Sequence, residues 1–389
     1  LRPGTNVAIL NMMLHFIIKS KLYNVDFVRD RTEGFDNFLK EIEKQDVDHL
    51  AKVAGVDKQL VKEAAIAYAT AKNSMEFHGL GVTEHEQGSK TVMLIADLAM
   101  ITGNIGRKGV GVNPLRGQNN VQGAADMGCQ PHQGAGYFEV SDEKNQKFYT
   151  EKYGVTHPTK PGLKIPQMFE AAINKELKGV WIIGEDIVQT DPNSAHVVEA
   201  MNSLELLVVQ EIFMSETAKL ATVVLPGTTF LEKDGTFTNT ERRVQRVNRA
   251  VPPLPGTKPD GVIVTDMMQK LGFDQPSYDA DQVLAEIADI VPFFKGITRE
   301  RLGKMGLQWP VKEDGTDTQI LHTEEFKLGK GRLKNFDWKE SSEIEANHKD
   351  YPLILTTSRV LQHYNAATMT RRTSNINIVD EDVLLIHPK

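Results

Sequence analysis

Apolar residues recur at helical spacing in the first part of the chain, and this period predicts a set of amphipathic helices. The predicted helices span Thr5–Ser20, Phe35–Glu43, Asp57–Lys72 and Thr91–Thr102. Thr5 or Asn6 is expected to cap the first helix, because either side chain can accept a hydrogen bond from a first-turn N–H group. The apolar stretch Ser74–Val82 carries two glycines near its end. It predicts a strand that runs into a glycine turn.

Strand and helix patterns alternate in the middle of the chain. The predicted strands are Gly179–Ile183, Leu206–Gln210 and Ala221–Leu225, and the helices between them are Ser194–Ser203 and Thr217–Lys219. Alternation at this spacing implies a parallel sheet with right-handed crossovers. Ligands of such sheets bind beyond the carboxyl ends of the strands. Two later helices are predicted at Asp260–Leu271 and Asp281–Ile290.

Other stretches lack a regular period. Gly109–Gly136 is rich in Gly, Asn and Gln, which predicts an ordered loop, and the charged stretch Gly303–Lys349 predicts a boundary. Beyond it, Pro352–Thr357 and Val383–Ile386 predict strands. Leu1 already lies in a segment that enters a helix, and the last strand has barely ended at the final residue. The chain is therefore expected to be an internal piece of a longer polypeptide.

Composition narrows the function classes. A net charge of −7 over 389 residues gives no general attraction to nucleic acid or anionic lipid. The single cysteine, Cys129, excludes a disulfide within the chain and a site of several thiolates. It fits a reducing compartment, so a cytoplasmic location is expected. No apolar run reaches the roughly 20 residues that a membrane-spanning helix needs.

One arginine stands among small and amide-bearing residues in the segment Asn113–Gly123. Arg116 is planar and always charged, and a guanidinium can hold a carboxylate through two parallel N–H bonds. The glycines on either side allow a ligand to approach the backbone. The alternative is an ordered loop whose arginine pairs with a nearby acid.

Polar residues follow the first two predicted strands of the middle sheet. They are Gly184, Glu185, Asp186, Thr190 and Asp191 after the first strand, and Gln210 and Glu211 after the second. Glu211 stands roughly 25 residues beyond the first turn, and an acid at about that distance often binds the ribose hydroxyls of a nucleotide. A carboxylate at Asp186 or Asp191 offers two parallel acceptors to the N–H groups of guanine. Helix capping is the structural alternative for both aspartates.

Two further constellations carry cations and hydroxyls. Thr236–Arg246 places three arginines near a polar turn that includes Asn239 and Arg243, which suits a phosphate-bearing ligand. A solvated basic strand is the alternative. Thr356–Arg359, followed by His363 and Tyr364, offers several donors after a strand, although a lone histidine is more often a packed residue than a ligand.

In this order, the four constellations resemble the catalytic subunits of molybdenum- or tungsten-dependent formate dehydrogenases, which carry two molybdopterin guanine dinucleotides. The most specific element of the resemblance is the segment Asn113–Gly123. Four other segments are shared more widely in the family: Gly184–Asp186, Val209–Glu211, Val224–Gly227 and Thr238–Arg243. The resemblance implies an α/β fold of two related dinucleotide-binding lobes with parallel sheets, plus the start of a C-terminal β-barrel domain. The implied bounds are 1–118 for the first lobe, 119–340 for the second and 341–389 for the barrel.

The resemblance also implies roles for individual residues. Arg116 would orient formate, with Gly117 and Gln118 lining the same pocket. One dinucleotide would lie at Gly79, Gly81 and Thr83, and at the turn Gly4-Thr5-Asn6. The other would lie at Gly184, Glu185, Asp186, Thr190, Asp191, Gln210 and Glu211. Asn239 and Arg243 would border the cofactors, and the last domain would contribute Thr357, Arg359, His363 and Tyr364.

The sequence also departs from this family pattern. The family's N-terminal cysteines for a [4Fe–4S] cluster are missing, as is the cysteine or selenocysteine, followed by histidine, that binds the metal. Both are expected upstream of Leu1. The implied reaction is two-electron oxidation of formate to CO2, or its reverse, with electrons passing to an iron–sulfur or NAD-linked subunit. A related enzyme such as a nitrate reductase, a cofactor-free structural subunit of a respiratory complex and a plain nucleotide-binding module remain alternatives.

Overall fold

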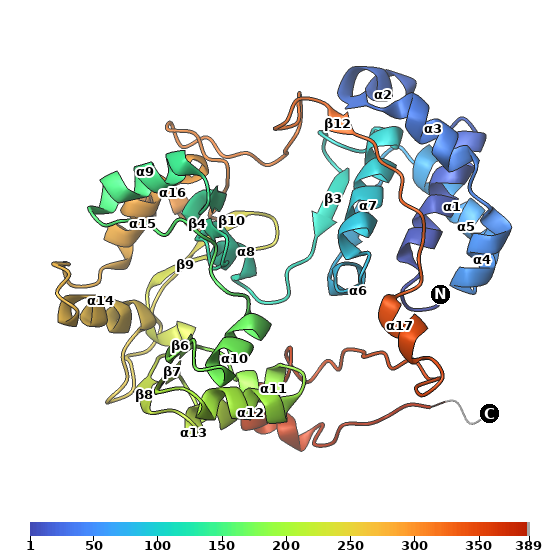
Figure 1. The fold of residues 1–389 in the computed structure, drawn as a ribbon. Coiled ribbons are helices and arrows are strands. Elements are labelled where there is room, and N and C mark those ends of the chain that lie inside the picture. Colours follow the sequence, from blue (N-terminus) through green and yellow to red (C-terminus); the bar gives the residue numbers. More distant parts are fainter. Residues whose placement is uncertain (387–389) are drawn as a thin grey trace. The chain divides into compact units, whose positions relative to one another are not determined.

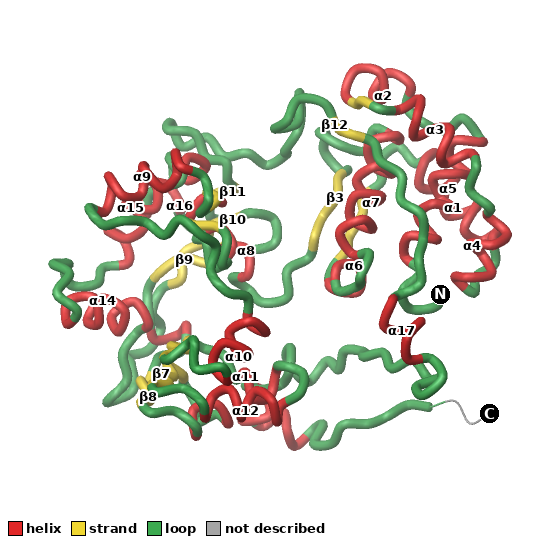
Figure 2. Tube along the Cα trace, viewed as in Figure 1, coloured by secondary structure: helices red, strands yellow, loops and turns green. Residues whose placement is uncertain are grey.

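The computed structural model describes residues 1–386, which form two compact units (Figure 1). Unit 1 comprises Leu1–Arg116 and Gln319–Ser358, and unit 2 comprises Gly117–Thr318 and the residues from Arg359 onward. Helices and short strands occur in both units, as Figure 2 shows, so the predicted α/β class is confirmed. In the described part of the chain, no helix combines the length and the apolar character that crossing a membrane requires.

Unit 1 is mainly helical and is built around α1. Its helices are α1 (Asn6–Lys19), α2 (Val25–Arg31), α3 (Phe35–Glu43), α4 (Val47–Ala54), α5 (Lys58–Thr70), α6 (Leu80–Thr83), α7 (Gly88–Thr102) and α17 (Ser342–Asn347). Its strands are β1 (Thr32–Glu33), β2 (Met75–His78), β3 (Gly111–Pro114) and β12 (Gly331–Arg332). α1 packs against α3, α4, α5 and α7. All four helices predicted in this region are confirmed.

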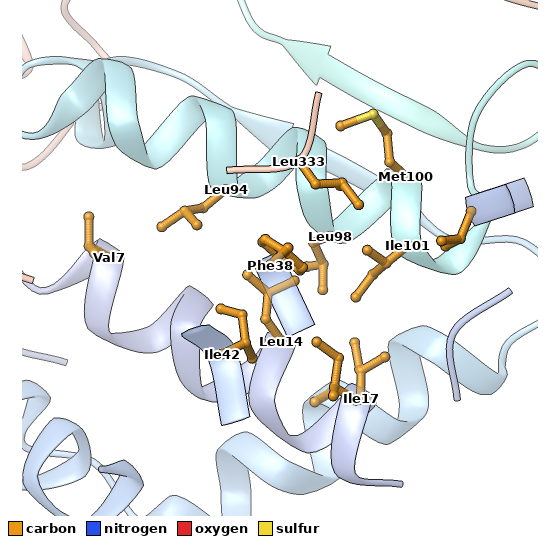
Figure 3. Close-up of a cluster of buried hydrophobic side chains, with 13 residues drawn as sticks. Val7, Leu14, Ile17, Phe38, Ile42, Leu94, Leu98, Met100, Ile101 and Leu333 are labelled. Atoms are coloured by element: carbon orange, nitrogen blue, oxygen red, sulfur yellow. The ribbon is translucent and has the colours of Figure 1, made fainter. Parts of the chain in front are cut away.

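The core of unit 1 explains why α1 is apolar around most of its circumference. Leu14 and Ile17 of α1 are fully buried against Phe38 of α3 and Leu94 of α7 (Figure 3). A helix with neighbours on several sides must present apolar residues to each of them. Thr5 occupies the position that precedes α1, but its hydroxyl donates to the carbonyl of Arg2 at 2.6 Å and makes no cap. The predicted capping of α1 is therefore wrong.

A late segment of the chain returns to unit 1. β12 pairs in parallel with β1, and Leu333 enters the core. The indole Nε1 of Trp338 donates to the carbonyl of Gly4 at 3.0 Å. Residues 319–340, predicted to belong to the second lobe, thus pack on unit 1. Isolated apolar residues in a charged segment have no period, so the sequence pattern did not reveal this packing.

A buried carboxyl on α7 makes the stability of unit 1 depend on pH. Asp97 is 1% exposed, and burial raises its pKa to about 8. The unfolded chain loses this proton near the ordinary value of 3.8, so the folded form holds more protons between these pH values. Stability therefore falls as pH rises from about 4 to 8. We expect Asp97→Asn to raise the free energy of unfolding by about 1–3 kcal/mol at pH 7.5 and by almost nothing at pH 4. Urea midpoints at both pH values measure this, and an equal shift at both would contradict it.

Unit 2 contains the predicted parallel sheet. β6 (Gly179–Ile183), β7 (Leu206–Glu211) and β8 (Val223–Pro226) pair in that order, each with its neighbour in parallel. The crossovers contain α11 (Ile187–Thr190) and α12 (Ser194–Asn202), and then α13 (Glu216–Lys219). α10 (Ile165–Ile173) packs on α12, and Phe169, Val197 and Leu207 share one buried cluster. The predicted strands are confirmed, with their ends shifted by one or two residues.

The remainder of unit 2 surrounds a second, antiparallel sheet. Its strands are β9 (Gly235–Thr238), β10 (Arg243–Val247) and β11 (Leu307–Gln308), and a separate hairpin pairs β4 (Gln133–Gly134) with β5 (Phe138–Glu139). The helices are α8 (Val121–Asp126), α9 (Glu143–Tyr153), α14 (Asp260–Lys270), α15 (Ala280–Ile290) and α16 (Arg299–Leu302). α14 and α15 were predicted.

Two predictions of local structure are wrong. The predicted loop Gly109–Gly136 contains β3, α8 and β4, whose polar or glycine-rich sequences carry no strand or helix period. The predicted strands Pro352–Thr357 and Val383–Ile386 are not formed, because neither pairs with a neighbour among residues 1–386. The final segment instead contains the 3-10 turns η4 (Thr370–Arg372) and η5 (Ser374–Asn377). Residues 387–389, predicted to follow a strand, lie outside the described part, and the barrel stays a prediction.

Candidate functional site

A cleft of about 270 Å³ opens at the carboxyl ends of β6, β7 and β8. Most of the polar residues predicted to follow the strands line it, together with one residue from the arginine loop and one from the last segment. These predicted site residues are Gln118, Gly184, Glu185, Asp186, Thr190, Gln210, Glu211 and Tyr364. The parallel sheet brings them together because the carboxyl ends of adjacent parallel strands meet at one edge.

Gln210 stands at the centre of the cleft with one end of its amide unpartnered. Its side chain is 1% exposed, and its Nε2 donates to Asp260 Oδ1 at 2.7 Å. Its Oε1 is buried without a hydrogen-bond partner among the described residues, as is the hydroxyl of Thr228, which also lines the cleft. Buried polar atoms are nearly always hydrogen-bonded, so this pair marks a place where a ligand can bind.

The two acids at the strand ends have different surroundings. Asp186 is 4% exposed, and its Oδ1 accepts from the backbone N and the hydroxyl of Thr217, at 3.0 and 2.7 Å. It therefore holds the first turn of α13. Glu211 is half-buried and accepts from the Ile212 N–H at 2.7 Å. Burial, together with the nearby Asp186 carboxylate, raises the pKa of Glu211.

The other residues that line the cleft were not predicted as site residues, and several of them carry polar or charged side chains. Asp260 begins α14 and accepts from both Gln210 and Lys233. Thr228 follows β8, so the rule that ligands bind at strand ends could have found it. Arg372 carried no sequence signal, because the segment around it has no period. Its guanidinium donates to the Thr368 carbonyl and lies 3.7 Å from Asp186 Oδ2, over the ring of Phe213.

Six predicted residues of unit 2 do not line this cleft. One of them is Gly117, which is exposed and whose carbonyl accepts from the Tyr364 hydroxyl at 3.3 Å. Asp191 is half-buried beside it, and burial raises the pKa of its carboxyl. Asn239 and Arg243 lie at the two ends of the turn between β9 and β10. The side-chain oxygen Oδ1 of Asn239 accepts from the backbone N–H of Arg243 at 3.0 Å. The imidazole of His363 contacts the Thr370 hydroxyl and the Val379 carbonyl. Arg359 is exposed.

Unit 1 has its own set of predicted site residues at the carboxyl ends of β2 and β3. The Leu115 N–H donates to the His78 carbonyl at 2.7 Å, so the turn at Gly79 lies beside the start of the arginine loop. The side-chain amide of Asn6 donates to the Gly81 carbonyl at 3.2 Å, which brings the turn Gly4-Thr5-Asn6 to the same place. Arg116 is the last residue of the first segment of unit 1 and is exposed, as is Thr357.

A single glycine positions the short helix α6, which carries Thr83. A Cβ atom on Gly88 would lie 2.2 Å from the Thr83 carbonyl oxygen, closer than any side chain permits. The glycine thus lets α6 pack directly on the start of α7. Among residues 1–386, no group of three or more His, Cys, Asp and Glu side chains is placed to hold a metal ion, and Cys129 is an exposed free thiol.

The parallel sheet, the polar cleft at its carboxyl ends and the glycine turns define an α/β protein with a candidate ligand site at the strand ends. The family model for molybdopterin oxidoreductases matches residues 1–270, and the chain belongs to that family. Among its relatives is the F420-dependent formate dehydrogenase subunit alpha of Methanocaldococcus jannaschii, 43% identical over 99% of this chain and 58% of that protein. Formate dehydrogenase H of Escherichia coli is 37% identical over 95% of this chain and 52% of its own length.

The structural comparison concerns the fold. Acetylene hydratase from Pelobacter acetylenicus superimposes with a TM-score of 0.62 and 19% sequence identity, covering 91% of this chain and 53% of that one. The chain thus spans little more than half the length of the relatives it matches.

Proposed function

We propose that the chain is part of a formate dehydrogenase catalytic subunit and binds two molybdopterin guanine dinucleotides with molybdenum or tungsten. The observation that carries the proposal is the buried, unpartnered Oε1 of Gln210 in a cleft at the carboxyl ends of three parallel strands. An orphaned acceptor at this place needs a ligand that donates N–H or O–H groups. A guanine base and a ribose supply both.

The charge of the cleft of unit 2 indicates which part of a dinucleotide it suits. Four acids line it, Glu185, Asp186, Glu211 and Asp260, against the two cations Lys233 and Arg372. An excess of carboxylates repels phosphates but accepts hydrogen bonds from base and ribose. The volume of about 270 Å³ is also below the 300–1,000 Å³ typical of larger ligands, at about the size for one nucleoside. We therefore assign the cleft to the nucleoside end of one dinucleotide.

The second dinucleotide is assigned to unit 1. Gly79 and Gly81 follow β2, and a Cβ atom on Gly81 would meet nothing within 4 Å. Backbone free of side chains permits close approach of a ligand, and the adjacent Thr83 offers a hydroxyl. The remaining predicted residues are proposed as outer contacts of the two cofactors. They are Asp191, Asn239, Arg243, Thr357, Arg359 and His363.

Arg116 is proposed to hold formate, with Gly117 and Gln118 beside it. It stands two residues beyond the end of β3, next to the glycine turn of unit 1. Formate offers only its charge and two oxygens, so a planar guanidinium with parallel N–H donors is the matching group. The relatives named as formate dehydrogenases support this choice of substrate.

The cofactor, when bound, supplies the two-electron chemistry that converts formate to CO2. This chain's residues bind it and orient the substrate. The metal-ligating cysteine or selenocysteine and the [4Fe–4S] ligands are proposed to lie outside this sequence. We further propose that an iron–sulfur or NAD-linked subunit accepts the electrons, and that the single cysteine reflects a cytoplasmic location.

Removal of the Glu211 carboxylate tests the cofactor assignment. In the full-length enzyme, Glu211→Ala should reduce molybdenum or tungsten content severalfold, because a half-buried acceptor at the strand end is lost. Elemental analysis per mole of protein measures it. Glu199→Ala, which removes an exposed carboxylate from α12 of the same unit, is the matched control and should retain wild-type metal. Equal metal in both variants would count against the assignment, and turnover of nitrate in place of formate would refute the substrate.

A further inference from the structure

Arg372 is the one cation in the cleft of unit 2 whose position the proposed cofactor role does not yet explain. Lys233, the other lining cation, is engaged by Asp260. Arg372 donates to the Thr368 carbonyl and lies 3.7 Å from Asp186 Oδ2, and its charge also acts on the Glu211 carboxylate. A guanidinium carries five N–H donors, so these two contacts leave it able to bind acceptors of a ligand.

The Arg372 guanidinium is held in place by an aromatic ring, and the segment that carries it is held by hydrogen bonds. Its central carbon lies 5.8 Å from the centroid of the Phe213 ring, a residue that also lines the cleft. The segment that carries it is fastened by the Tyr364 hydroxyl, which donates to the Gly117 carbonyl at 3.3 Å, and by Asn375 Nδ2, which donates to the Gln362 carbonyl at 2.7 Å. A donor fork held in this way can select a ligand by the pattern of its acceptors.

The rest of the cleft offers the opposite polarity. Gln210 Oε1 is an unpartnered acceptor, and Glu211 and Asp260 add carboxylate oxygens. A ligand must therefore present donors on one side and acceptors toward Arg372. Guanine has N–H donors at its N1 and N2 positions and acceptors at O6 and N7. Adenine places an amino group where guanine has O6, and that amino group would face the N–H donors of the arginine.

We infer that Arg372 selects a guanine over an adenine base in this cleft, by donating to the O6 and N7 edge of the purine while Gln210 and the acids accept from the opposite edge. The inference rests on the proposed binding of a guanine dinucleotide and adds the residue that reads the base. Phosphate is not the ligand of Arg372 in this arrangement, because the surrounding carboxylates outnumber the cations.

Nucleoside binding to the full-length enzyme, purified without cofactor, tests this without turnover. Guanosine, inosine and adenosine are titrated by isothermal calorimetry against the wild type, Arg372→Ala and Arg372→Lys. Inosine keeps O6 and N7 but lacks the 2-amino group, so it isolates the edge that Arg372 reads. We expect the wild type to bind guanosine and inosine roughly 5- to 150-fold more tightly than adenosine. Arg372→Ala should lose that ratio, and Arg372→Lys should keep only part of it.

Asn375→Ala is the control for loosening of the segment, since it removes the hydrogen bond to the Gln362 carbonyl, lies outside the cleft and leaves Arg372 in place. It should preserve the preference for guanosine over adenosine. An unchanged preference in Arg372→Ala, or an equal loss of both purines in that variant, would overturn the inference while leaving the cofactor assignment standing. Failure of all three nucleosides to bind the wild type would remove the cofactor assignment of this cleft and the inference with it.

Discussion

Arg116→Lys in the full-length enzyme should raise the apparent KM for formate by about 10- to 150-fold, because an ammonium cannot replace both parallel N–H bonds of the guanidinium. A hydrogen bond to a charged group contributes about 1.5–3 kcal/mol, and this range sets the expected factor. The overall charge is retained, so attraction of the anion persists and turnover at saturating formate falls less than kcat/KM does. Steady-state assays over a wide range of formate concentration separate the two constants.

The matched control for this variant is Arg29→Lys, also in unit 1. Arg29 is exposed on α2 and forms ion pairs with Asp26 and Asp30, so the substitution changes the same chemical group outside the segment Asn113–Gly123. Its kinetic constants should equal those of the wild type. If Arg116→Lys also left KM and kcat unchanged, the formate-binding role of Arg116 would be refuted, whatever the metal content.

The sheet of unit 2 was predictable because its signals are local. Each of β6, β7 and β8 is a short apolar run followed by a turn or a polar residue, and the rule for parallel sheets then places Gln210 and Glu211 at a common edge. The segment Asn113–Gly123 was recognisable by composition and by resemblance. Its strand β3 was not, because a run containing Asn and Pro has no strand propensity and forms through pairing with β2.

The residues that were missed depend on contacts between distant parts of the chain. Asp260 reaches Gln210 across 50 positions, and Arg372 reaches Asp186 only because the last segment folds back over the strand ends. Neither contact leaves a periodic trace in the sequence. The same reason explains residues 319–340, in which Leu333 and Trp338 return to the core of unit 1. Local pattern predicts elements, whereas these contacts follow from the tertiary fold.

Asp186→Ala should lower the free energy of unfolding by about 2–4 kcal/mol, the largest stability effect that we expect from a residue of the cleft. The carboxylate accepts from the backbone N and the hydroxyl of Thr217, and more weakly from the Glu216 N–H at 3.4 Å. Removing it leaves buried donors of the first turn of α13 without a partner, at about 1–3 kcal/mol for a group, while the cap at Ser215 stays in place. Urea unfolding followed by tryptophan fluorescence measures the change.

Glu185 provides the control, because it lies in the same turn as Asp186 but is exposed. Its carboxylate accepts from the Thr190 hydroxyl, so Glu185→Ala should change stability by less than about 0.5 kcal/mol. Asp186→Asn keeps one acceptor for Thr217 and loses the charge that faces Arg372, so its effect should fall between the two. If Asp186→Ala were as stable as the wild type but failed to retain the cofactor, the carboxylate would belong to a ligand and not to α13. The sequence left two interpretations open for Asp186, helix capping and guanine recognition. Measuring both unfolding and cofactor retention distinguishes a structural role of the carboxylate from a role in ligand binding.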